Sequence, residues 1–176
     1  MQHIHDFRIS LKEYHEKGQD NQFPEFCICP LCSAQAPLKK HGFYQRYAIV
    51  FRHCFRIFIR RYYCTQCKKT VSVLPTLLLP YYQHSLETIM GCLEDYFIKQ
   101  RSRVPFYRQF VDFHGKRFLR NVPRYISFFR DLDRHIVFNG NRKEKAIKLL
   151  EMISSFPKEP FAKRFFNHFN TSFMAL

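Results

Sequence analysis

The chain has 176 residues and is 46% hydrophobic, which suffices for one domain or two small units with a packed interior and excludes wholesale disorder. Its 29 Lys and Arg outnumber its 14 Asp and Glu, and the resulting net charge of +15 is self-repulsive unless the chain meets a polyanion, most commonly nucleic acid. The polar start and the lack of an apolar run of membrane-spanning length predict a cytoplasmic protein with no membrane partner.

The first predicted region is an N-terminal arm over residues 1–26. Within it, Phe7, Ile9 and Leu11 alternate with polar side chains, and this period of two predicts a short strand. Glycine, proline and polar residues from 17 to 24 predict a loop after the strand.

The second predicted region is a β-rich zinc module over residues 27–80. Aromatic and β-branched residues dominate 43–51 and 55–63, which predicts two strands. In the second strand the apolar positions alternate with arginines, so one face can pack while the other presents charge. His41-Gly42 is predicted to form a turn.

Four of the seven cysteines form two CxxC pairs, Cys29 with Cys32 and Cys64 with Cys67. Two intervening residues let a tight turn aim both sulfurs at one point, and residues 33–63 suffice for a hairpin that brings the two turns together. The pattern is typical of a zinc ribbon, in which four thiolates hold one zinc ion tetrahedrally. Such a closed site has no open position for water, so the zinc would be structural.

Two alternatives bear on these ligands. A redox CxxC is disfavoured because that motif usually stands alone. Cys27 is the rival ligand, although a CxC pair has poorer geometry than a CxxC knuckle, and whether it replaces a predicted ligand stays open. We assign Cys27 and Cys54 to packing or spare thiols, and Cys92 to the core side of the first helix.

The third predicted region, residues 81–176, is helical. Ser85 is expected to cap a helix that buries Leu86, Ile89, Met90, Leu93 and Phe97. A second helix is expected near 104–113, starting at Ser102 or Arg103 and Pro105 and ending at His114-Gly115. A third helix is expected to start at Asn121 and Pro123 and to reach about residue 137. Further helices are expected over 142–156 and 161–169. The fold class predicted is therefore α+β, a zinc ribbon followed by a helical domain.

The helices near 104–113 and 122–137 predict a helix-turn-helix at about 102–137, with Arg120 and Arg124 at the start of a recognition helix. The zinc module is also suited to nucleic acid, because residues 27–80 contain no Asp or Glu at all. The predicted nucleic-acid-binding residues are Lys39, Lys40, Arg46, Arg52, Arg56, Arg60, Arg61, Lys68, Lys69, Lys116, Arg117, Arg120 and Arg124.

No enzyme is predicted. The chain has no phosphate-binding loop, serine-hydrolase elbow or zinc-protease motif. Its carboxylates are few, and Asp131 and Asp133 would lie on opposite sides of one helix, where they cannot form a metal-binding pair.

Several segments resemble the zinc-ribbon regions of bacterial mobile-element proteins: CPLC at 29–32, KKHGFYQRY at 39–47, RRYYCTQCKKTVSVLP at 60–75 and LLPYYQHSLETI at 78–89. These include N-terminal regions of insertion-sequence transposases and standalone relatives, some classed only as a domain of unknown function. The resemblance covers residues 29–96. It implies that the four paired cysteines are the ligands, that the chain recognises DNA, and that a helix-turn-helix follows. Because the chain stops before a nuclease domain, it implies an accessory or regulatory role beside a separate transposase or other catalytic protein.

The expected function is therefore zinc-dependent binding of nucleic acid, with duplex DNA favoured over RNA and a nucleoid-associated location. An RNA-binding module is the first alternative, since exposed aromatic residues could stack on unpaired bases. A protein-interaction subunit of a larger nucleoprotein complex is the second.

Overall fold

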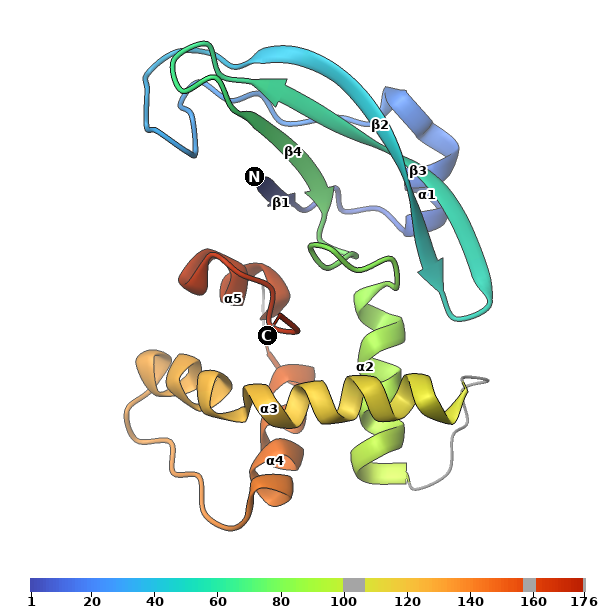
Figure 1. Ribbon diagram of the computed structural model, residues 1–176, viewed down its shortest axis with the longest axis vertical. Helices are drawn as coiled ribbons and strands as arrows, with labels where there is room; N and C mark the ends of the chain where they lie inside the picture. Colours follow the sequence, from blue (N-terminus) through green and yellow to red (C-terminus); the bar gives the residue numbers. More distant parts are fainter. Residues whose placement is uncertain (100–106, 157–160, 176) are drawn as a thin grey trace. The chain divides into compact units, whose positions relative to one another are not determined.

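The computed structural model of the chain (Figure 1) describes residues 1–99, 107–156 and 161–175. The chain divides into two compact units, Met1–Ser85 and Leu86–Leu176, called unit 1 and unit 2 below. All four strands lie in unit 1, and unit 2 is helical in its described residues. The predicted α+β class, with a β-rich part before a helical part, is confirmed.

Unit 1 is built on one four-stranded sheet with the order β1-β4-β3-β2. Its strands are β1 (Gln2–His5), β2 (Lys39–Val50), β3 (His53–Tyr63) and β4 (Thr70–Pro75). The β2–β3 hairpin is antiparallel along its whole length, whereas β4 pairs with β3 only at Arg61–Tyr63. β1 runs parallel to β4 at the opposite edge. The hairpin therefore continues past the end of the β3–β4 ladder as a ribbon (Figure 1), along which Ile49 of β2 also pairs with His84.

The two strands predicted at 43–51 and 55–63 are confirmed as parts of β2 and β3. The turn predicted at His41-Gly42 is wrong, because both residues lie inside β2. The register of the hairpin shifts between Lys40 and Phe43, and Gly42 has a φ of 82°. This is a β-bulge, in which glycine supplies the left-handed backbone that other residues rarely adopt.

The N-terminal residues form β1 and a short helix, α1 (Leu11–Lys17), which continues into the 3₁₀ turn η1 (Gly18–Asp20). The strand predicted around Phe7–Leu11 is wrong. Ser10 and Glu13 form a capping box, in which each side chain accepts the other's backbone N–H, and this starts a helix where alternation suggested a strand. On α1, buried Tyr14 donates its hydroxyl to the Phe58 carbonyl over 2.9 Å and so fixes the helix on the hairpin.

Unit 2 contains α2 (Leu86–Glu94), the π-helical turn η2 (Asp95–Lys99), α3 (Arg108–Leu132), α4 (Arg142–Ser154) and α5 (Phe161–Phe169). Its core is aromatic: Phe128 packs against Phe161 and Phe165, with ring centroids 5.4 Å from each. The helices predicted over 142–156 and 161–169 are confirmed as α4 and α5. Asn141 starts α4 with a second capping box, formed with Glu144.

The turn predicted inside a helix-turn-helix is not there, because α3 is continuous through His114, Gly115 and Pro123. A Cβ atom on Gly115 would lie 2.3 Å from Cγ of Tyr96, so this glycine allows the close approach of an aromatic ring and does not break the helix. Asn121 does not cap a helix; its amide donates to the Ala175 carbonyl over 2.8 Å. The helix start predicted at Ser102, Arg103 and Pro105 lies outside the described residues.

In the described part of the chain, no helix combines the length and the apolar character needed to cross a membrane.

Candidate metal centre

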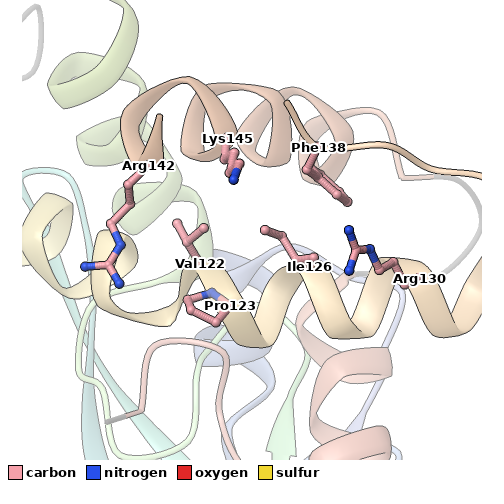
Figure 2. A pocket seen from close by; sticks show the side chains of 7 residues that line it. All are labelled: Val122, Pro123, Ile126, Arg130, Phe138, Arg142 and Lys145. Atoms are coloured by element: carbon pink, nitrogen blue, oxygen red, sulfur yellow. The ribbon is translucent and has the colours of Figure 1, made fainter. Parts of the chain in front are cut away.

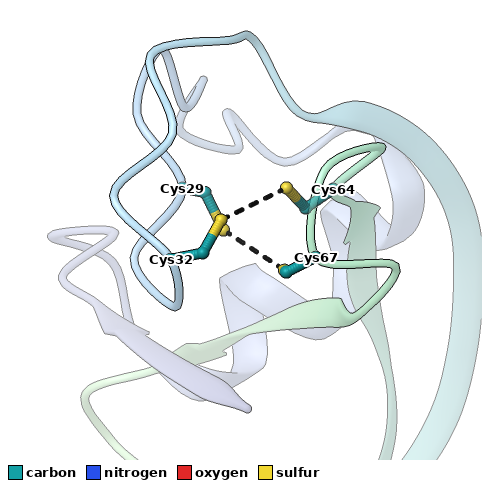
Figure 3. Close-up of side chains that lie close together, drawn as sticks. All are labelled: Cys29, Cys32, Cys64 and Cys67. Carbon is teal, nitrogen blue, oxygen red and sulfur yellow. Dashed lines mark hydrogen bonds between the residues drawn. The ribbon is translucent and has the colours of Figure 1, made fainter.

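The four cysteines predicted as ligands come from two loops of unit 1 and meet at one point (Figure 3). Cys29 and Cys32 lie in the segment that leads to β2. Cys64 follows directly after β3, and Cys67 lies in the same turn, before β4 begins at Thr70. The antiparallel pairing of β3 with β4 thus positions the second pair, and the segment before β2 carries the first pair to it.

The sulfur positions fit a tetrahedral site. The Sγ atoms of Cys29 and Cys67 are 3.9 Å apart, those of Cys32 and Cys64 are 3.8 Å apart, and all four lie within 4.8 Å of one another. Four thiolates at about 2.3 Å from a central ion have sulfur–sulfur separations of about 3.8 Å. The group could therefore hold one metal ion.

The two loops have the same local backbone geometry. The N–H of the first cysteine donates to the carbonyl five residues on, from Cys29 to Ala34 and from Cys64 to Lys69, each over 3.0 Å. The residue after the second cysteine is left-handed in both loops, with a φ of 56° at Ser33 and at Lys68. Such turns point backbone N–H groups at the sulfurs, as the Leu31 N–H does at Cys29 Sγ over 3.4 Å. Each pair is therefore a preformed knuckle.

Burial and hydrogen bonding make the four thiols unequal. Cys29 and Cys64 are buried against Leu38, Tyr62 and Val71 in a small hydrophobic cluster, while Cys32 is exposed. Hydrogen bonds from the backbone N–H groups of Cys67 and Gln66 lower the pKa of Cys64 to about 6. At Cys32 a hydrogen bond from the Ala34 backbone acts the same way, but burial and the three neighbouring thiols outweigh it and raise its pKa to about 11. The Cys64 thiol thus ionises more readily than the Cys32 thiol.

The other three cysteines lie outside this group. Cys27, the rival ligand, is exposed and does not belong to the four-sulfur cluster. Cys54 is exposed on β3 and Cys92 is buried in α2, where burial raises the pKa of its thiol to about 12. In a site with four protein sulfurs no coordination position is left for water, so a bound ion would serve the fold.

The predicted nucleic-acid-binding residues divide into two groups. Eight are exposed: Lys39, Lys40, Arg52, Arg56, Lys68, Lys69, Lys116 and Arg120. The other five are half-buried and contact their own unit. Arg46, Arg117 and Arg124 donate to the carbonyls of Tyr82, Met174 and Ala175, and Arg60 and Arg61 lie over the rings of Phe43 and Tyr44. Burial lowers the pKa of Arg46.

The predicted set omits two exposed side chains of the hairpin, Tyr47 and His53. Tyr47 pairs across the hairpin with Arg56, so an aromatic ring and a guanidinium share one face of the ribbon. The alternation that places Arg56 on this face also applies to β2, and it could have identified Tyr47 from the sequence.

Residues 29–105 match a family model described as "Domain of unknown function (DUF6431)". The matched segment begins at the first ligand and contains all four cysteines of the centre. No curated protein matches the chain. No solved structure matches it either.

Proposed function

We propose that the four-cysteine centre holds one structural zinc ion and that unit 1 binds duplex DNA through its basic hairpin. Zinc is the ion that suits the donor set. Tetrahedral four-sulfur sites take zinc or iron, and zinc has no redox chemistry and no geometric demand beyond the tetrahedron that the knuckles offer.

The observation that carries the DNA proposal is the outer part of the β2–β3 hairpin. It continues beyond the β3–β4 ladder and exposes Tyr47, Arg52, His53 and Arg56, which we call the hairpin tip. The major groove of DNA is wide enough to admit a two-stranded β-ribbon. The tip could enter that groove with its arginines directed at base edges or at the flanking phosphates.

The charge of the surrounding surface supports the same proposal. The knuckle lysines, Lys39, Lys40, Lys68 and Lys69, are all exposed beside the metal centre. Since residues 27–80 contain no acidic side chain, no carboxylate from this segment neutralises them or the tip. A surface of one sign attracts phosphates at long range and makes binding depend steeply on salt.

The resemblance to mobile-element zinc ribbons also suggests a biological role for the DNA binding. We propose an accessory or regulatory DNA-binding protein that works with a separate transposase or other catalytic protein. The proposal includes no catalytic step. Asp131 is paired with His168 over 3.1 Å, and Asp133 accepts the His135 backbone N–H, so each carboxylate has a structural use.

The test is binding of the zinc-loaded chain to random duplex DNA, single-stranded DNA and structured RNA across a salt series. Arg52→Gln with Arg56→Gln removes two charges from the tip, and Lys12→Gln with Lys17→Gln removes two from α1 as a matched control. If both arginines contact phosphates, the tip variant lowers the salt slope for duplex DNA by about 1.8, at about 0.9 for each contact. The α1 variant leaves the slope unchanged.

Other outcomes would contradict the proposal in different ways. Equal losses in the two variants would mean that net charge, and not the tip, drives binding. Preference for structured RNA would replace the proposal with the RNA-binding alternative. Weak binding to all three nucleic acids would move the search to protein partners.

A further inference from the structure

A groove in unit 2 combines an apolar floor with three cations. It has a volume of about 480 Å³ and lies between α3 and α4 (Figure 2). Its lining residues are Val122, Pro123, Ile126 and Arg130 of α3, Phe138 of the α3–α4 connection, and Arg142 and Lys145 of α4. The volume is that of a site for a small ligand or for one or two units of a polymer, and not of a site for a duplex.

The charges of this groove are not neutralised within the described part of the chain. No carboxylate lines it, and the side chains of Arg130, Arg142 and Lys145 make no hydrogen bond or ion pair among the described residues. The acid next in sequence, Glu144, is occupied by the capping box, where it accepts from the N–H and the side-chain amide of Asn141. The next cation on α4, Lys148, donates to the Val137 carbonyl and lies over the ring of Phe138, 5.5 Å from its centroid.

The order of the cations and apolar side chains along the groove limits the class of ligand that can fit it. Arg142 lies beside Val122 and Pro123 at one end, Lys145 lies in the middle, and Arg130 lies beside Phe138 at the other end (Figure 2). Val122 and Arg130 are eight residues apart on one helix, which corresponds to about 12 Å. A fatty acid or another anion with charge at one end would leave the far cation unmatched, whereas a nucleic-acid strand places phosphates on both sides of a flat, largely apolar base.

We propose that this groove binds an unpaired nucleotide of a single strand, with its base on the apolar floor and its phosphates on the three cations. Val122 and Phe138 are almost fully buried, and half-buried Ile126 offers part of the exposed floor. Single-strand binding generally combines a basic groove with aromatic side chains on which bases stack. In this groove the exposed part of the platform is aliphatic and is formed by Pro123 and Ile126. The site lies in unit 2, shares no residue with the hairpin tip, and so goes beyond the proposed duplex binding and is tested separately from it.

The experiment follows the methyl resonance of Ile126 in the full, zinc-loaded chain as a short oligothymidylate is added. We expect this resonance to shift on titration. Arg142→Gln with Lys145→Gln is expected to abolish the shift and to lower the salt slope of binding by about 1.4, at about 0.7 for each single-strand phosphate contact. The matched control, Lys143→Gln with Arg108→Gln, removes two exposed charges of unit 2 outside the groove and keeps the shift.

Three comparison ligands test the assignment. An abasic strand of the same length is expected to bind at least about fivefold more weakly, because it lacks the base. If the abasic strand bound as tightly as oligothymidylate, the groove would not be a site for the base. If free thymidine monophosphate bound as tightly as oligothymidylate, the ligand would not need to be part of a strand. An acidic peptide that moves Ile126 when oligothymidylate does not would make the groove a protein-docking site.

Duplex DNA added to the same samples keeps the two proposals apart. If the hairpin-tip variant lost duplex binding but kept the Ile126 response, the loss would be assigned to unit 1 alone. An unmoved Ile126 resonance with normal duplex binding would overturn the groove proposal and leave the hairpin proposal standing.

Discussion

Of all single side chains, Cys64 is the one whose substitution is expected to affect the folding of unit 1 most. It joins the end of β3 to the metal centre and is buried in the adjoining cluster. We expect Cys64→Ser to abolish metal binding and to unfold unit 1. Structural zinc sites contribute roughly 10–16 kcal/mol in small domains, which is comparable with or exceeds the whole stability of most domains. Metal content by elemental analysis and the β signal in circular dichroism measure the two effects.

The matched control for this substitution is Cys54→Ser, which changes an exposed cysteine of β3 outside the four-sulfur group. It is expected to keep one metal ion per chain and the wild-type spectrum. If Cys64→Ser also kept its metal and its fold, Cys64 would not be a ligand.

Tyr14 gives unit 1 a dependence on alkaline pH. Burial raises the pKa of its hydroxyl above the usual value, and Tyr44 adds to the effect. Since the neutral form is favoured in the folded state, this contribution to stability is complete below about pH 10 and is lost as the pH rises through the folded pKa. Tyr14→Phe should cost about 1 kcal/mol at pH 7, because the Phe58 carbonyl loses its donor.

The same variant should lose less stability than the wild type above about pH 10, because it has no buried hydroxyl to ionise. Urea unfolding of both proteins at neutral and alkaline pH measures the difference between their free energies of unfolding. A difference that stayed constant across this range would show that Tyr14 does not titrate with unfolding.

Single residues differed in how far their positions could be predicted. The clustering of Cys29, Cys32, Cys64 and Cys67 could be predicted because the CxxC spacing sets the geometry of each knuckle locally. The environment of Arg46 and Arg117 could not, because their partners are carbonyls of Tyr82 and Met174, which lie far along the chain. A basic residue looks the same in the sequence whether its guanidinium faces solvent or a carbonyl.

At the scale of elements, α3 depends on a glycine that looks like a helix breaker. Alanine is a better helix former than glycine by about 1 kcal/mol, so Gly115→Ala would stabilise an isolated helix. Here the new Cβ would lie 2.3–2.5 Å from ring atoms of Tyr96 on η2. The nearest atom, Cγ, can move away only if Tyr96 changes its χ1 angle or its backbone shifts, so we expect a net loss of about 1–2 kcal/mol in thermal or urea unfolding.

A double-mutant cycle with Tyr96→Ala shows whether the ring is the cause. In that background the space beside Gly115 is open, and Gly115→Ala should become neutral or stabilising by up to about 1 kcal/mol. The same loss in both backgrounds would assign the effect to something other than the Tyr96 contact.

Two further elements differ from their sequence patterns for similar reasons. His41-Gly42 has the composition of a turn but forms a bulge, because pairing along β2 and β3 continues on both sides of it. Residues 7–11 alternate like a strand, but the Ser10–Glu13 capping box starts a helix there. In the first case the pairing of two strands decided the structure, and in the second case a local capping box decided it.

At the scale of the whole molecule, the chain consists of two compact units with separate cores. In unit 1 the small cluster around Cys29 and Cys64 adjoins the metal centre. The core of unit 2 is built from its own aromatic rings and contains none of the four ligands. Metal should therefore stabilise the two units to very different degrees.

We expect removal of the metal to unfold unit 1 and to leave unit 2 folded. The knuckles join the segment before β2 to the β3–β4 turn, so without the ion that cluster loses its cross-link. Hydrogen exchange read by mass spectrometry, before and after treatment with a strong chelator, should show β2, β3 and β4 losing protection while α3, α4 and α5 keep theirs.

Adding zinc back to the chelated chain is the control, and it should restore protection to the strands. Joint loss of protection in both units would mean that they fold as one cooperative body, and unchanged protection in both would mean that the sheet does not need the ion. The expected result also separates the two binding proposals. A chain without metal should lose duplex binding with its hairpin, while the Ile126 response to oligothymidylate should persist, because the α3–α4 groove draws every lining residue from unit 2.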